Sequence, residues 1–176
     1  LASTLKEGSV SALNYSKRLD GVTTGIFVTS ILTVLFPMLA REANNEDPRG
    51  LKRVIIRGIN MIILVAIPAS VGMMVLATPI VTLVFQRGKF DATATIMTAG
   101  VLSFSSIGIA FMAIKQYLYR VFYSLKDTKT TLGISAFNVA ITVIFNLILI
   151  QFLEHRGIAL ATAIANILTT ILTLFL

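Results

Sequence analysis

Cysteine and tryptophan are absent from this 176-residue chain, and histidine occurs once, as His155. Without cysteine the chain can form neither a disulfide nor a thiolate metal site. A single histidine argues against a histidine-based metal site or a catalytic triad. Phosphate-binding glycine loops and the Gly-x-Ser-x-Gly motif are also missing, and most of the eight carboxylates stand near turns. The sequence therefore predicts a protein that is not an enzyme and needs no metal or cofactor.

Charge is scarce as well, at 13% of the residues against 56% hydrophobic ones, whereas a soluble domain has roughly 25% charged residues. The charges gather in clusters that separate five uncharged runs, each of at least 20 residues: 21–40, 58–86, 92–114, 130–153 and 157–176. About 20 apolar residues in a helix cross the hydrocarbon core of a bilayer. This pattern predicts an all-α polytopic membrane protein with five transmembrane helices.

The net charge of +7 would indicate a nucleic-acid partner in a soluble chain. In a membrane protein the same excess is typical of cytoplasmic loops, so we expect no nucleic acid here. Eight basic residues lie at the turns near 41–57 and 120–129, and four lie at the opposite turns if Lys17 and Arg18, near the start of the first span, are counted as inside the membrane. The heavier side should face the cytoplasm, which places 87–89 and His155 outside.

Capping residues and prolines set the expected spans at about 9–40, 51–77 with a short helix 79–85, 91–125, 127–153 and 156–176. Asp47, Asp91 and Asp127 stand where helix caps are expected. Pro68 and Pro79 predict a bent or interrupted second helix. Gly88 suits a left-handed turn position, and 154–157 form the last turn.

Two adjacent cations, Lys17 and Arg18, stand in the first predicted span. If the helix begins at a serine cap, Ser9 or Ser11, then Arg18 lies about two turns inside it. Helical steps from Arg18 then reach only small or hydroxyl residues: Gly21, Gly25, Thr29 and Thr33. A cation at membrane depth that faces a watery cavity is a functional hypothesis. The alternative is that both cations reach the headgroups and that Gly21 and Gly25 merely pack helices.

Lys115 is a second candidate for a cation inside the membrane. A lysine that reaches the interface beside Tyr117 and Tyr119 would explain the pattern equally well. The amide of Asn138 most often bridges helices in such a position, and lining a polar pathway is the less common role.

Four stretches resemble the MurJ (MviN) family of lipid II flippases, within the multidrug/oligosaccharidyl-lipid/polysaccharide exporter superfamily. They are GSVSALNY with the following Arg18-Leu19 at 8–19, ILTVLFP at 31–37, FQRGKF at 85–90 and FYSLKDTKT at 122–130. They occur in the family's order and spacing over the whole chain. The resemblance implies a segment covering about helices eight to twelve, with a remnant of helix seven, in one lobe of a two-lobed, fourteen-helix exporter fold.

The resemblance also implies a function. The family flips a lipid-linked sugar diphosphate, the peptidoglycan precursor lipid II, from the inner to the outer leaflet of the bacterial cytoplasmic membrane by alternating access. The arginine matching Arg18 lines its central cavity, which makes Arg18 the main expected substrate contact. Lys17, Gly21, Gly25 and Thr29 are further candidates on the cavity face, and the expected partners are the lipid substrate, the bilayer and the remaining helices.

The chain departs from the family pattern at Lys17, Thr23 and Thr131. Lys17 replaces a residue that is often acidic or neutral, so the partner of Arg18 stays open. Two other functions remain under consideration: a related exporter of drugs or other lipid-linked glycans, and a membrane scaffold that transports nothing.

Overall fold

The computed structural model describes residues 8–45, 48–88 and 90–176, and this part of the chain contains helices and no strand. The helices are α1 (Ser9–Thr23), α2 (Thr29–Asn44), α3 (Pro48–Val75), α4 (Ala77–Phe85), α5 (Ala92–Ser106), α6 (Ile109–Ser124) and α7 (Thr128–Phe175). A π-helical turn, Thr24–Val28, joins α1 to α2. The cap expected at Asp47 and the outward position of Lys89 lie outside the described residues.

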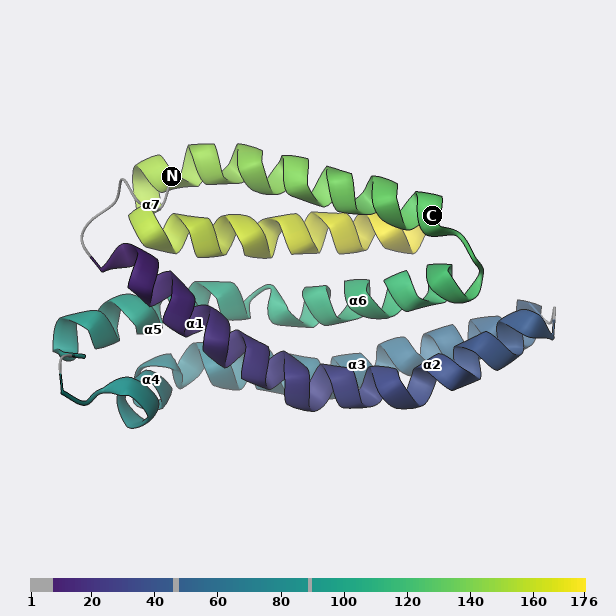
Figure 1. Cartoon of the computed structure of the whole chain (residues 1–176), viewed down its shortest axis with the longest axis horizontal. Helices are drawn as coiled ribbons and strands as arrows, with labels where there is room; N and C mark the ends of the chain where they lie inside the picture. The colour runs from purple at the N-terminus through teal and green to yellow at the C-terminus, as the bar shows by residue number, and fades with distance from the viewer. Residues whose placement is uncertain (1–7, 46–47, 89) are drawn as a thin grey trace.

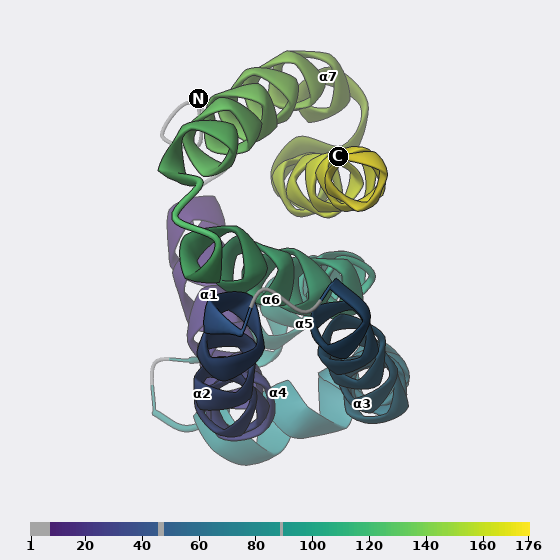
Figure 2. The ribbon, with the colours of Figure 1, turned by 90° about the vertical axis from the view of Figure 1, so that its right-hand side faces the viewer.

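Most helices run along the long axis of the molecule (Figure 1). Seen from the end, α6 lies between α7 on one side and the pair α2 and α3 on the other (Figure 2). The other end of the molecule contains α4, α5 and the start of α1 (Figure 1). The two ends therefore differ in construction, with long helices packed side by side at one and short helices joined by turns at the other.

Two helices, α3 and α7, are long and apolar enough to cross a membrane. Two bent pairs also qualify when each is counted as one crossing: α1 with α2, bent by 43°, and α5 with α6, bent by 49°. Within α7, Glu154 has φ 50° and ψ −128°, and there two helical arms meet and fold back on each other (Figures 1 and 2). The described helices thus give two crossings by length and composition, or up to four when each bent pair counts as one, and the five separate spans stay a prediction.

The largest hydrophobic core lies where α2, α3 and α6 meet. Leu32, Leu35 and Leu39 from α2 are buried against Ile62 of α3 and Tyr117 of α6. The Tyr117 hydroxyl donates a hydrogen bond to the Val54 carbonyl oxygen at 2.8 Å. Tyr117 lies so close to Gly58 that a Cβ there would overlap its ring, so glycine lets α3 and α6 approach each other.

Large apolar side chains also cover much of the outside. Leu64, Leu83, Leu132, Phe152 and Phe175 are each more than 70% exposed and come from α3, α4 and both arms of α7. A soluble protein rarely exposes so much continuous apolar surface. The surface is therefore suited to contact with lipid.

Several local predictions are confirmed. The Asp91 carboxylate caps α5 by accepting from the Ala94 amide at 2.8 Å, and Asp127 caps α7 by accepting from the Thr130 amide at 3.0 Å. Hydrogen bonds from the Thr130 hydroxyl and amide hold the pKa of Asp127 below its usual value. Gly88 has φ 60°, in the left-handed region.

The start of α1 differs from the serine cap that the sequence predicts. The helix begins at Ser9, but its cap is Gly8, with φ 91° and no side-chain hydrogen bond to the free amides. Glycine adopts this left-handed conformation without steric cost. The predicted start is thus right, and the predicted capping group is wrong.

The interruption expected between Pro68 and Pro79 falls at Leu76. α3 continues through Pro68 to Val75, Leu76 leaves the helical region at φ −95° and ψ 16°, and α4 begins at Ala77. Pro79 occupies the first turn of α4, where its missing amide has no helical acceptor to satisfy.

Candidate substrate-binding face

The first helix has two distinct faces. Its buried residues recur every three or four positions and include Ser9, Ala12, Leu13, Ser16, Leu19 and Thr23. Leu19 packs with Ala77 and Val81 of α4 and with Leu102 of α5. The other face carries Lys17 and Arg18, which are both exposed. Packing of the apolar side onto α4 and α5 therefore turns the two cations outward.

Arg18 lies over an aromatic ring at the edge of a hollow. Its guanidinium carbon is 5.7 Å from the centroid of the Tyr15 ring, a cation–π contact. Phe85, Arg87 and Phe90 complete the lining of this hollow, whose volume is about 380 Å³. The predicted main site residue is therefore on the surface, beside a second arginine that the sequence did not associate with it.

The small residues that continue the predicted face are open. Gly21, Gly25 and Thr29 are exposed, and a Cβ added at either glycine would meet no described atom within 4 Å. The alternative that these glycines pack helices is thus not realised in the described part of the chain. The Thr29 hydroxyl donates to the Thr24 carbonyl oxygen at 3.4 Å, and the Thr33 hydroxyl donates to the Thr29 carbonyl oxygen at 2.8 Å.

The π-helical turn lies in the middle of this face. It spans Thr24–Val28, includes Gly25, and coincides with the 43° bend between the two halves of the first span. Such single π turns inside α-helices are frequent at functional sites. The bend therefore falls on the face that the sequence assigned to the cavity.

Lys17 belongs to a different hollow from Arg18. It lines a groove of about 350 Å³ between α1, α6 and the second arm of α7, together with Asp20, Gly21 and Asn166. One carboxylate oxygen of Asp20 is buried without a hydrogen-bond partner among the described residues. The structure therefore groups Lys17 with Gly21 and with the Asp20 carboxylate, which sequence reasoning missed and which only its spacing of three residues from Lys17 could have indicated.

Lys115 is buried, with 8% of its surface exposed, and its ammonium donates to the Asn166 side-chain oxygen at 2.6 Å. Tyr117 beside it is fully buried. The interpretation of Lys115 as a residue that reaches the interface is therefore wrong. Asn138 bridges the two arms of α7, as predicted, because its amide donates to the Thr169 hydroxyl at 2.9 Å and to the Ala165 carbonyl at 3.2 Å.

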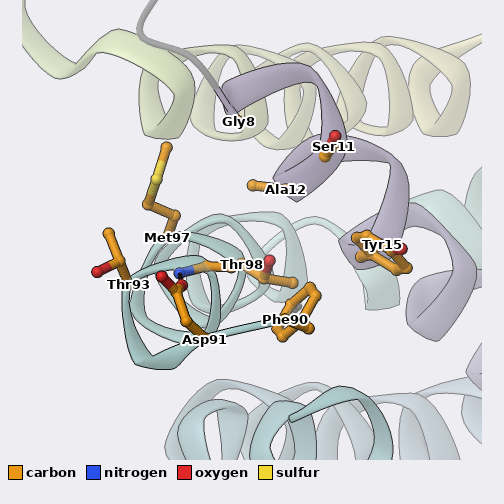
Figure 3. Close-up of a pocket in the computed structure, with 10 residues that line it drawn as sticks. Gly8, Ser11, Ala12, Tyr15, Phe90, Asp91, Thr93, Met97 and Thr98 are labelled. Atoms are coloured by element: carbon orange, nitrogen blue, oxygen red, sulfur yellow. Dashed lines mark hydrogen bonds between the residues drawn. The ribbon is translucent and has the colours of Figure 1, made fainter. Parts of the chain in front are cut away.

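A second hollow adjoins that of Arg18. It lies between the starts of α1 and α5 and has a volume of about 560 Å³ (Figure 3). It shares Tyr15 and Phe90 with the hollow of Arg18. Its rim carries Ser11, Thr93 and the Asp91 carboxylate. The Tyr15 and Phe90 rings thus separate a hollow with two cations from one with a carboxylate.

The apolar exterior and the helical crossings define a segment of a multi-pass membrane protein, and its exposed cations lie on an open face of small residues. Comparison with known proteins gives the family.

The model of one family, described as lipid II flippase MurJ, matches residues 1–176, the whole chain. The chain therefore belongs to this family, and the resemblance found in its motifs is confirmed. A probable lipid II flippase MurJ of Vibrio cholerae is 34% identical over 169 residues, which are 96% of this chain and 32% of that protein. The corresponding protein of Buchnera aphidicola subsp. Baizongia pistaciae is 32% identical over 94% of this chain and 32% of its own length.

A solved structure supports the same assignment. The lipid II flippase MurJ in an inward closed conformation matches with a TM-score of 0.91 and 28% identity, over 99% of this chain and 37% of that one. The chain thus has the fold of part of that protein. It spans about a third of the length of the relatives it matches, so it is a segment of a larger all-α membrane protein.

Proposed function

We propose that this segment belongs to a transporter that moves a lipid-linked sugar diphosphate from the inner to the outer leaflet of a bacterial cytoplasmic membrane. Its family supports this proposal, because the relatives are named lipid II flippases. The transport step is a change of access between two sides of the membrane, so no covalent bond needs to form or break. The remaining helices of the whole protein complete the cavity.

One observation carries the proposal: Arg18 lies exposed on an open face, with an aromatic ring beside it and no ion pair among the described residues. A guanidinium group matches the oxygens of a phosphate in charge and geometry. A bare diphosphate cannot enter hydrocarbon, since burying a charge without a partner is very costly. An available guanidinium on a polar face offsets part of that cost.

The residues after Arg18 suit passage of a bulky head group. Gly21 and Gly25 present no side chain, and the hydroxyls of Thr29 and Thr33 are already bonded to their own helix. The face therefore offers space, and its two threonine hydroxyls, whose protons are already donated, can only accept hydrogen bonds from a sugar. A transported group must be bound and also released, which weak contacts along the path permit.

The test uses the full-length protein reconstituted in vesicles, with transport of lipid II as the measurement. Arg18→Ala should abolish transport while the protein stays folded, because water replaces an exposed side chain. Arg18→Lys should retain part of the activity, since a point charge still attracts phosphate but loses the bidentate geometry. Lys17→Ala is the matched control, because Lys17 is also exposed but lines another groove.

Loss of transport in Lys17→Ala with full activity in Arg18→Ala would show that the wrong cation and the wrong groove had been chosen. Binding assays separate the proposed substrate from cationic drugs, which a related exporter would prefer. Full transport by Arg18→Ala together with binding of cationic drugs would favour that exporter. If the unaltered protein shows no measurable transport, and Arg18→Ala is expressed normally, a scaffold that transports nothing would be favoured.

We also propose that the turn between α2 and α3 faces the cytoplasm and the turn between α4 and α5 faces outward. The bias of basic residues toward the first turn supports this orientation. Single cysteines at Asn45 and Lys89 in this cysteine-free chain test it with an impermeant thiol reagent. Position 89 should be labelled in intact cells and position 45 only after lysis, and the reverse result would invert the orientation.

A further inference from the structure

Arg87 lies in the turn that follows α4, 69 residues after Arg18, and lines the same hollow. Three elements meet there: α1 contributes Tyr15 and Arg18, α4 ends at Phe85, and Phe90 precedes α5. The chain therefore brings a second arginine, from a distant part of the sequence, into the lining of the hollow that contains the predicted site residue.

The floor of the hollow is a compact group of three aromatic rings. The ring centroids of Tyr15 and Phe85 are 4.8 Å apart, those of Tyr15 and Phe90 are 5.1 Å apart, and those of Phe85 and Phe90 are 5.8 Å apart. Aromatic pairs at such distances are favourable and restrict one another. The rings therefore fix the start of α1 against the turn that holds Arg87.

The electrostatics of the hollow are one-sided. The described residues that line it include two guanidinium groups and no carboxylate, and neither arginine forms an ion pair within the described part of the chain. The nearby Asp91 carboxylate lines the other hollow, beyond the Tyr15 and Phe90 rings, and accepts the Ala94 amide (Figure 3). Two like charges in one small hollow repel each other unless an anion lies between them.

We infer that Arg87 and Arg18 together form a binding site for a phosphate-bearing lipid headgroup, with Tyr15, Phe85 and Phe90 as its apolar floor. The inference rests on the proposed function and adds a second residue to it. Phosphate oxygens accept two or more charge-assisted hydrogen bonds, which two guanidinium groups can donate from different sides. The apolar floor suits the first carbons of a lipid chain or the face of a sugar ring. The headgroup is either the diphosphate of the transported lipid or the phosphate of an ordinary membrane lipid.

The experiment measures binding of two probes to the purified full-length protein: undecaprenyl diphosphate, and phosphatidylglycerol in mixed micelles. The variants are Arg87→Gln, Arg18→Gln and the double variant. Arg53→Gln is the control, because it removes the same charge from an exposed arginine on α3 whose hollow has no aromatic floor. Thermal unfolding of each variant verifies the fold, and Arg87→Lys provides a second, charge-conserving change at the same position.

We expect Arg87→Gln to weaken binding of the diphosphate about tenfold, roughly the worth of one charge-assisted hydrogen bond. Arg87→Lys should weaken it less, and Arg53→Gln should leave it unchanged. The double variant should lose less than the sum of the single losses, because both groups hold the same anion. A loss confined to the diphosphate assigns the site to the transported lipid, and an equal loss for phosphatidylglycerol assigns it to membrane lipids.

Arg87→Gln with unchanged affinity for both probes overturns the inference. If Arg18→Gln weakens diphosphate binding in that case, the proposed function stands and only the role of Arg87 is lost. If neither arginine affects the diphosphate but both affect phosphatidylglycerol, the two-arginine site stands and Arg18 is no longer supported as the substrate contact.

Discussion

Tyr117 with Lys115 and Tyr15 with Arg18 both combine an aromatic ring with a cation, but their surroundings are opposite. The first pair lies on α6, where Tyr117 is fully buried and the Lys115 ammonium donates to Asn166. The second pair lies at the start of α1, where Arg18 is exposed and its guanidinium lies over the Tyr15 ring.

The difference separates two uses of a cation in a membrane protein. The partner of Lys115 comes from the same chain, so the Lys115 ammonium joins α6 to the second arm of α7. The hollow around Arg18 holds a second cation and no carboxylate, so its charge remains available to an external anion. A cation at membrane depth therefore indicates a binding site only when the surrounding chain leaves it without a partner.

The largest effect that would test this comparison is expected in the packed region, at Gly58. The methyl group of Gly58→Ala would overlap the ring of Tyr117. The ring cannot easily move away, because its hydroxyl donates a hydrogen bond to the Val54 carbonyl oxygen. Overpacking of this kind typically costs about 1–3 kcal/mol, and the fixed ring favours the upper end. The free energy of unfolding should fall accordingly, measured by thermal or denaturant unfolding in detergent.

Gly72→Ala is the matched control, because it lies in the same helix and a Cβ there meets no described atom within 4 Å. That variant should be at least as stable as the unaltered protein, since alanine has the higher helix propensity. Equal stability of the two variants would show that the region around Tyr117 can move apart, and the contrast with the open end would be lost.

The next effect concerns the bond between Lys115 and Asn166. Lys115→Met and Asn166→Ala should each destabilise the protein, and a double-mutant cycle should give a coupling of about 0.6–1.7 kcal/mol, the range from the average to the maximum that such cycles give for interhelical hydrogen bonds in a membrane protein. Transport per folded molecule should stay near normal in both single variants. Loss of transport without loss of stability would instead make Lys115 part of the substrate path.

Much of the fold follows from local signals in the sequence. The uncharged runs, the caps at Asp91 and Asp127 and the reversal near Glu154 depend on residues within a few positions of each other, and each is found where it was expected. The bend between α5 and α6 lies at a contact with a distant residue. A Cβ on Gly108 would be 2.7 Å from the Cα of Ala163, so the break lies where α7 approaches the backbone closely. The sequence predicted one span over 91–125.

The candidate site was predictable only where it depends on local spacing along the chain. Helical spacing placed Arg18 on an exposed face with Gly21 and Gly25, because those positions depend on one helix alone. The grouping of Arg18 with Arg87, and of Lys17 with Asp20, depends on how α1 packs against other helices. Spacing within one helix contains no such information, so contacts between distant residues had to come from the structure.

The smallest expected effect is at Asp91, the carboxylate that lines the hollow adjoining the two-arginine hollow. Asp91→Ala removes the cap of α5 and should lower the free energy of unfolding by about 1 kcal/mol. Asp91→Asn keeps a side-chain oxygen for the Ala94 amide, so it should cost only a few tenths of a kcal/mol. The asparagine variant thus removes the charge with little change in structure, and its affinity for undecaprenyl diphosphate should be equal or slightly higher, because a nearby negative charge is gone. A marked loss of affinity in Asp91→Asn would mean that the carboxylate positions one of the arginines, and the separation of the two hollows by Tyr15 and Phe90 would then be wrong.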